Sequence, residues 1–248
     1  MIAETKAIIL SNRKHKENSS ILTVYSEKYG RVSYVLYGTK SKKTGRRMAF
    51  LQPLSLVSII SESKSNSDLQ VAKDIQADSS SLSIISNPYK NAVAMFIAEF
   101  LLHALRAGES DLPLFSFLYN SVKILEYHPG NIANFHIAFL IKLSHFLGFA
   151  PDANEIRRTS VAMHTYSFFD LKSSAYTQNK PFHRHFLDKA ESITLLNLLR
   201  INYRNMTYFR FSRAERQLLL SQIVSYYQLH IQGFGEIKSL DVMKEIFE

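Results

Sequence analysis

Cysteine and tryptophan are both absent from the 248 residues of this chain. Without cysteine it can form no disulfide, no thiol nucleophile and no cysteine-ligated zinc or iron–sulfur site. Long apolar runs are missing as well, since none approaches the roughly 18 to 20 residues of a membrane-spanning helix. The opening residues, MIAETKAIIL, lack the basic start and apolar stretch of a signal peptide. We therefore expect a cytoplasmic protein with no membrane contact.

Signatures of catalysis are also missing. The chain contains no GxSxG, HExxH or GxxxxGK[ST] motif. Glu99, His103 and Arg106 share one face of a predicted helix, but such a face is far more often an ion-paired surface than an acid–base site. His183 and His185 lack further ligands at metal-binding spacing, which favours a solvated loop. These absences favour a binding protein over an enzyme, with no cofactor and no metal.

Acidic residues are scarce in the first third of the chain, while the whole chain has a net charge of +9. Residues 1–80 hold 13 Lys and Arg against 7 Asp and Glu, and the stretch from Lys28 to Ser61 holds seven basic residues and no acidic one. This balance indicates a polyanionic partner, although a basic surface that serves only solubility is the alternative. The charge is densest in YGTKSKKTGRRMAFLQP, which contains Lys40, Lys42, Lys43, Arg46 and Arg47.

Five short segments rich in Val, Ile, Tyr and Thr predict strands in the first 75 residues. They are Thr5–Leu10, Ser20–Ser26, Arg31–Tyr37, Leu54–Ile60 and Asp68–Lys73. Five short strands suit a small closed barrel, and the OB fold, a common binder of oligonucleotides, is the natural candidate. Periodicity alone leaves an SH3-like barrel open.

Helical spacing replaces this pattern after residue 80. Asn87-Pro88 and Asp111 predict the starts of two helices, a third spans 132–147, and Ser212 with Glu215 forms a capping box ahead of a fourth. A further helical segment is SITLLNLLR, a last short helix is SLDVMKEIF, and residues 150–190 show no sustained period. The predicted class is α+β: a five-stranded OB-fold barrel over 1–80, then a mostly α-helical domain over 81–248 with an irregular part at 150–190.

Aromatic residues lie close in sequence to the basic ones. Tyr25, Tyr34 and Tyr37 fall on the predicted strands, near the basic segment Lys40–Arg47. Other nearby cations are Arg13, Lys14, Lys16 and Arg31. Cations that follow phosphates and rings that stack on bases are what binding of single strands requires. Two alternatives remain open: tyrosines that only pack beside a solvated loop, and an adaptor whose OB-like barrel binds an acidic peptide.

Several motifs, in order, carry a resemblance to a known family. They are KAIILSNRKHKENSSILTVYSEKYGRVSYVLYGTKSKK, LQPLSLV, AEFLLHAL, LPLFSFLYNSVKILE, FHIAFLIKLSHFLGFAP and QGFGEIKSLDVMKEIF. Together they span almost the whole chain, which resembles the RecO family of bacterial DNA repair proteins, a family of recombination mediators. The resemblance implies an N-terminal OB domain followed by a helical domain, binding of single- and double-stranded DNA, and annealing of complementary strands.

The same resemblance implies partners and site residues. Family members work with RecR, and often RecF, so that RecA displaces the single-strand-binding protein, whose acidic C-terminal tail docks on the helical domain. The resemblance thus implies that the protein is associated with the nucleoid in the cytoplasm. The DNA-contact role carries over onto Lys40, Lys42, Lys43, Arg46 and Arg47, and then onto Arg13, Lys14, Lys16 and Arg31. Tyr37 is added as a stacking residue, and Arg106 or Lys142 would meet the carboxylates of the tail.

The chain departs from the family in one respect. Many members place four cysteines for a zinc ion after the LGFAP-like segment, whereas ANEIRRTSVAMHTYSFFDLKSSAYTQNKPFHRH contains none. Residues 150–190 are therefore expected to be the equivalent of the family's zinc lobe, held together by packing alone.

Overall fold

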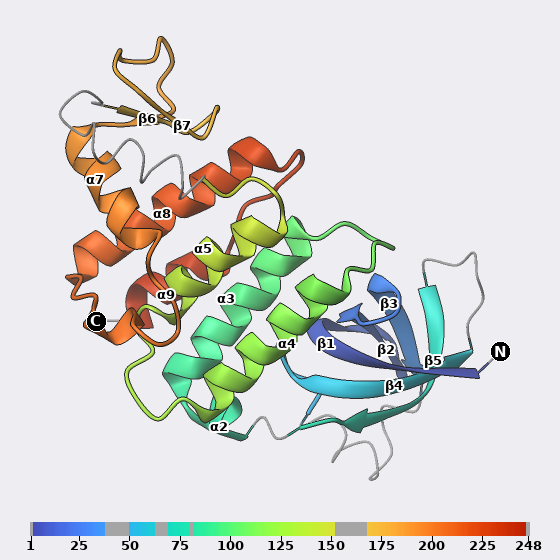
Figure 1. The fold of residues 1–248 in the computed structure, drawn as a ribbon. Coiled ribbons are helices and arrows are strands. Elements are labelled where there is room, and N and C mark those ends of the chain that lie inside the picture. Colours follow the sequence, from blue (N-terminus) through green and yellow to red (C-terminus); the bar gives the residue numbers. More distant parts are fainter. Residues whose placement is uncertain (1, 38–49, 63–68, 80–81, 152–167, 247–248) are drawn as a thin grey trace. The chain divides into compact units, whose positions relative to one another are not determined.

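The computed structural model describes residues 2–37, 50–62, 69–79, 82–151 and 168–246 (Figure 1). They form two compact units, which are described separately. The first unit comprises Met1–Ile132 and Glu236–Glu248, and the second comprises Ala133–Gly235. The first unit thus groups the barrel with helices that lie beyond the predicted boundary at residue 80. That boundary remains a prediction about sequence domains.

The N-terminal strands close into a five-stranded barrel in the order β1-β2-β3-β5-β4. The strands are β1 (Ile2–Lys16), β2 (Ser19–Ser26), β3 (Gly30–Tyr37), β4 (Leu56–Glu62) and β5 (Leu69–Ala77). Strand β1 closes the barrel because it pairs with β4 from Ile2 to Ile8 and with β2 from Ala7 to Lys16. Strands β3 and β5 pair in parallel. The barrel is of the OB type, as predicted.

Apolar side chains from all five strands fill the barrel. Ala7 and Ile9 of β1 alternate inward, as a strand with one buried face requires, and Leu51 joins them from the segment before β4. The remaining buried members are Leu22, Val24, Tyr34, Leu36, Val57, Ile59, Ala72 and Ile75. Burial of this cluster is the main source of the barrel's stability.

The helices described in the first unit are α2 (Leu82–Ser86), α3 (Pro88–Ala104), α4 (Leu112–Tyr127) and, near the C-terminus, α9 (Ser239–Ile246). Three of them, α3, α4 and α9, begin where the sequence predicts, whereas α2 was not predicted. Asn87 accepts hydrogen bonds from the N–H groups of Tyr89 and Lys90, and Asp111 accepts one from that of Leu114. These side chains bind donors that the first helical turn leaves unpaired.

A buried ionic cluster connects α2, α3 and α4. The Glu126 carboxylate accepts hydrogen bonds from the N–H groups of Ser83 and Ile84, both at 2.8 Å. The Lys90 ammonium donates to the Ser83 hydroxyl and to the carbonyls of Glu126 and His128. Burial lowers the pKa of Lys90, although the Glu126 carboxylate opposes that shift. Both charges are therefore fully hydrogen-bonded, as buried charges must be.

Barrel and helices meet at the β2–β3 turn. Gly30 has φ +62°, and a Cβ there would lie 2.0 Å from the carbonyl oxygen of Glu109. Next to it, the Arg31 carbonyl accepts a hydrogen bond from the Gly108 N–H at 3.0 Å. The Arg31 guanidinium donates to the Leu102 carbonyl at 2.6 Å. Only glycine permits this approach of two backbones.

The second unit consists of helices and a small sheet. The helices are α5 (Phe135–Phe146), α7 (Lys189–Leu198), the short 3₁₀ helix η1 (Met206–Tyr208) and α8 (Arg213–His230). The capping box of Ser212 and Glu215 is present at α8, as predicted, and Asp188 forms another with Glu191 at α7. None of the helices among the described residues is both long and apolar enough to cross a bilayer.

Helix α5 is buried on nearly every side, as its apolar sequence predicts. Lys142 and His145 are exposed, whereas Asn134 is buried and donates hydrogen bonds to the carbonyls of Met206 and Phe209. His136 is also buried, and burial together with the positive charge of Arg216 lowers its pKa to about 3.

Residues 168–187, expected to be irregular, form a three-stranded sheet in the order β7-β6-β8. Its strands are β6 (Phe168–Asp170), β7 (Ala175–Thr177) and β8 (Phe186–Leu187). Strands of two or three residues are too short for an alternating pattern to show in the sequence, and aromatic contacts such as that of Phe169 with Tyr176 hold them.

Gly30 and Gly108 offer a matched pair of substitutions. We expect Gly108→Ala to lower the free energy of unfolding by about 1 to 2 kcal/mol, because φ is +75° there but no atom lies within 4 Å of an added Cβ. Gly30→Ala adds a backbone clash and should cost about 1 to 3 kcal/mol more. Urea denaturation of both variants measures the difference. Equal losses would contradict the close approach at Gly30.

Candidate nucleic-acid interface

Four of the predicted DNA-binding residues lie at one end of the barrel. Arg13, Lys14 and Lys16 form the last part of β1, where Lys14 pairs with Ser20 and Lys16 with Ser19. On the other side of β2, Ser19 pairs with Tyr37. Because neighbouring strands lie about 4.8 Å apart, the ends of β1 and β3 are about 10 Å from each other across β2. We call Arg13, Lys14, Lys16 and Tyr37 the basic end of the barrel.

The basic end is exposed and unobstructed in the part of the chain that the structure describes. All three cations are exposed, and the Tyr37 ring is 63% exposed. None of the ion pairs formed among described residues involves Arg13, Lys14 or Lys16. The turn between β1 and β2 is also one of the loops with which OB folds bind oligonucleotides.

Lys40, Lys42, Lys43, Arg46 and Arg47 lie outside the described residues. Both flanks of their segment are described, however. The chain enters it from Tyr37 and leaves it at Phe50, which packs against the barrel core together with the buried Leu51. The Leu51 carbonyl accepts a hydrogen bond from the side-chain amide of Asn12 at 3.4 Å. Both flanks of the segment are thus adjacent to the basic end.

Tyr25 and Tyr34 cannot stack on bases, because both rings are buried. Tyr34 belongs to the barrel core, and Tyr25 stacks on Phe115 of α4 with ring centroids 6.5 Å apart. Burial, with the nearby Asp111 carboxylate, raises the pKa of Tyr25 to about 12. The alternative that strand tyrosines pack rather than stack is correct for these two, whereas Tyr37 remains available.

Arg31 lies at the opposite end of β3 from Tyr37. Its guanidinium donates to the Leu102 carbonyl, so the structure gives this side chain a role in joining barrel and helices. The structure does not bring Arg31 together with the basic end, and its contact with DNA stays a prediction.

The proposed tail-binding residues belong to different units. Arg106, in the first unit, is exposed and lies 4.0 Å from the Glu109 carboxylate. Lys142, in the second unit, is exposed with its ammonium 6.0 Å from the centre of the Phe146 ring. Each is accessible to a carboxylate, and neither lies with the other in a described pocket.

Glu99 has a partner far away in sequence. Its carboxylate accepts hydrogen bonds from the N–H groups of Lys238 and Ser239, at 3.0 and 2.8 Å, and from the Ser239 hydroxyl, all at the start of α9. Partial burial opposes ionisation, but the hydrogen bonds from Ser239 and Lys238 hold the pKa of Glu99 below its ordinary value. Of Glu99, His103 and Arg106, which share the helix face considered above as an acid–base site, Glu99 therefore caps α9.

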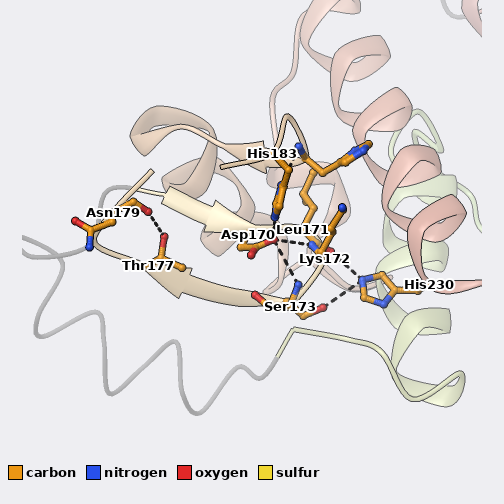
Figure 2. Close-up of polar contacts among 10 residues, drawn as sticks. Asp170, Leu171, Lys172, Ser173, Thr177, Asn179, His183 and His230 are labelled. Carbon is orange, nitrogen blue, oxygen red and sulfur yellow. Dashed lines mark hydrogen bonds and ion pairs between the residues drawn. The ribbon is translucent and has the colours of Figure 1, made fainter. Parts of the chain in front are cut away.

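The sheet at 168–187 is stabilised by hydrogen bonds where the family's zinc lobe is expected (Figure 2). The Asp170 carboxylate accepts from the N–H groups of Lys172 and Ser173 and lies 3.4 Å from the His183 imidazole. His230 bonds to the Leu171 carbonyl at 2.9 Å. Within the described ranges no three His, Cys, Asp or Glu residues converge as metal ligands.

A second arginine-rich stretch becomes apparent once exposure is known. Arg200, Arg204, Arg210 and Arg213 are exposed between α7 and the first turn of α8. The sequence carried a signal for them, because no acidic residue occurs between Ser192 and Ala214. Their net charge is modest beside that of the barrel, which is why sequence analysis did not single them out.

The barrel and its basic end define a protein of the OB-fold class, whose members commonly bind oligonucleotides or oligosaccharides. Comparison with known proteins is more specific. The family model described as "Recombination protein O N terminal" matches residues 1–79, and "Recombination protein O C terminal" matches residues 85–241. The chain belongs to the recombination protein O (RecO) family.

Relatives named "DNA repair protein RecO" match the chain along its whole length. The protein from Azobacteroides pseudotrichonymphae is 37% identical over 248 residues, and that from Bacteroides fragilis is 35% identical over 249. The protein from Porphyromonas gingivalis is 34% identical over 254 residues. Each alignment covers 100% of both chains.

The cap at α9 gives a pH-dependent prediction. Because the folded pKa of Glu99 is lowered, its contribution to stability is present at pH 7 and lost as the pH falls below its ordinary pKa of 4.5. Glu99→Gln should lower the free energy of unfolding by about 1 to 2 kcal/mol at pH 7 and by less at lower pH. Urea denaturation across this range measures the difference. Glu245→Gln, at an exposed position of α9, is the control and should change little.

Proposed function

We propose that the protein is a non-enzymatic recombination mediator that binds single- and double-stranded DNA through the basic end of its barrel. One observation carries the proposal. Arg13, Lys14, Lys16 and Tyr37 converge at the end of an OB barrel where the segment containing Lys40, Lys42, Lys43, Arg46 and Arg47 begins and ends. Cations that neutralise phosphates and an exposed ring that stacks on a base bind a strand without reading its sequence.

Annealing of complementary strands follows from the same chemistry. Two strands repel each other through their phosphates, and a basic surface that displaces their counterions offsets that repulsion with no bond made or broken. The proposed reaction therefore needs neither a catalytic residue nor a cofactor. It places the protein in the cytoplasm, at the nucleoid, where its DNA substrates are.

The mediator role adds protein partners. The chain's relatives are named for DNA repair, and the family resemblance adds RecR, RecA and the single-strand-binding protein as partners. An acidic tail of the latter protein would find an exposed cation at Arg106 or at Lys142. In this role the protein, with RecR, helps RecA onto DNA that is coated with single-strand-binding protein.

Salt dependence tests the basic end. For single strands, log K falls with log salt concentration with a slope of about −0.7 per neutralised phosphate. Replacing Arg13, Lys14 and Lys16 together by Gln should make the slope shallower by about two, and replacing Lys42, Lys43, Arg46 and Arg47 by Ala should make it shallower by about three. Fluorescence anisotropy of a labelled oligonucleotide measures both slopes.

A matched single substitution serves as control. Lys28→Gln removes one exposed charge from the β2–β3 turn, at the far end of these strands, and should leave the slope unchanged, whereas Lys14→Gln should reduce it. An unchanged slope in both multiple variants would exclude the basic end as the DNA site. Absence of any binding at micromolar protein and moderate salt would instead favour the adaptor alternative.

Annealing of coated strands tests the mediator role. We expect the protein to anneal complementary oligonucleotides covered with intact single-strand-binding protein, and to do so more slowly when that protein lacks its acidic C-terminal tail. Arg106→Ala and Lys142→Ala should reproduce the slower rate with the intact tail. A rate that does not depend on the tail would remove the mediator role while leaving DNA binding in place.

A further inference from the structure

The loop between α7 and α8 is rich in both arginine and aromatic residues. We call residues 200–213, RINYRNMTYFRFSR, the arginine loop. Arg200, Arg204 and Arg210 are exposed, and within the part of the chain that the structure describes none of these three forms an ion pair. The Tyr208 ring is 81% exposed.

Asparagine side chains fix the backbone of this loop. The Asn202 side-chain oxygen accepts hydrogen bonds from the N–H groups of Arg204 and Asn205. The side-chain amides of Asn202 and Asn205 both donate to the Arg200 carbonyl. Asn205 also accepts from the Asn202 N–H at 2.7 Å. The arginines at 200 and 204 therefore project from a hydrogen-bonded turn.

The second half of the loop is attached to the core of the unit. The buried Asn134 donates to the carbonyls of Met206 and Phe209 at 3.0 and 2.8 Å. Arg216 donates to the Asn134 side-chain oxygen and to the Phe211 carbonyl. Tyr208 is thus held between two fixed points, so its exposure is imposed by the backbone.

A groove of about 690 Å³ runs beside the loop, within the second unit. Arg200 and Arg210 line it together with Tyr208, Phe209 and Phe211, and Leu218 adds an exposed apolar side chain from α8. Its two carboxylates are both used in helix caps: Glu191 accepts from the Asp188 N–H and from Gln222, and Glu215 from the Ser212 N–H and hydroxyl. These carboxylates keep their negative charge, but both accept hydrogen bonds within the chain. The groups left to bind a ligand are therefore the guanidinium groups of Arg200 and Arg210 and the ring of Tyr208.

We propose that this groove and the arginine loop beside it form a second nucleic-acid-binding surface. It holds a single strand with phosphates on Arg200 and Arg210, which line the groove, and on Arg204 of the loop, and with a base on the Tyr208 ring. The inference rests on the proposed function for the nature of the ligand and goes beyond it in placing a contact on the helical part of the chain. An acidic peptide shares the charge, but the exposed ring of Tyr208 offers a flat stacking face, which a base uses best. An annealing protein with two such surfaces could hold one strand on each.

The test uses the full chain and an oligothymidine of about 30 nucleotides, longer than the roughly 4 to 16 that one OB fold covers. Arg200, Arg204 and Arg210 are replaced together by Gln. We expect the slope of log K against log salt to become shallower by about two. The control removes the same charge from the small sheet of the same unit, by replacing Lys172, Lys180 and Arg184 by Gln, and should leave the slope as it is.

Tyr208 separates stacking from charge. Tyr208→Ala should weaken binding about five-fold or more, whereas Tyr208→Phe, which keeps the ring, should bind like the unchanged chain. Irradiation of a complex with an oligonucleotide that contains 5-iododeoxyuridine should crosslink the peptide that contains Tyr208. Circular dichroism melts of each variant confirm that the fold is retained.

The outcomes are distinguishable from those for the barrel. An unchanged slope in the Arg200, Arg204 and Arg210 variant, with the basic-end variants still showing theirs, would overturn the second surface and leave the proposed function intact. Loss of binding to a labelled acidic peptide in that variant, with DNA binding unchanged, would also overturn it, because the groove would then take a peptide. If the unchanged chain binds no DNA, both proposals are wrong.

Discussion

The close contact between Gly30 and the Glu109 carbonyl decides which end of the barrel is covered by helices. At this point a strand turn and the α3–α4 connection approach so closely that a single added carbon would lie 2.0 Å from an oxygen. The hydrogen bonds of Arg31 to Leu102 and Gly108 reinforce the same contact. Because β3 begins at Gly30 and ends at Tyr37, the helices occupy one end of the strand and the basic residues the other.

Local signals predicted much of this fold. Enrichment in Val, Ile, Tyr and Thr located the strands. Asn87, Asp111 and Ser212 marked helix starts because a side chain that satisfies free N–H groups acts within four residues. The interpretations that changed depend on contacts between distant segments. Whether Tyr34 faces the core or solvent is set by the pairing register of its strand, and the partner of Glu99 lies 140 residues further along the chain.

The sequence reveals where the basic residues are more readily than it reveals what each of them contacts. The Lys40–Arg47 segment is conspicuous because five cations occur within eight positions. Arg13, Lys14 and Lys16 lie near Tyr37, where that segment begins, only through the pairing of β1, β2 and β3. Arg31 shows the converse, since a cation beside that site in sequence has its hydrogen-bonding partner on a helix. The arginine loop depends on Asn134, more than 60 residues before it, which no local pattern reveals.

The second unit is inserted in the first, because residues 236–248 return to the unit that residues 1–132 began. Helix α9 packs on α3, and Glu99 caps it. During synthesis, therefore, the Glu99 carboxylate on α3 cannot bind the start of α9 until all of the second unit has emerged from the ribosome. A nascent chain can complete its inserted unit before the unit that contains the barrel, so the barrel's unit would reach its final stability last.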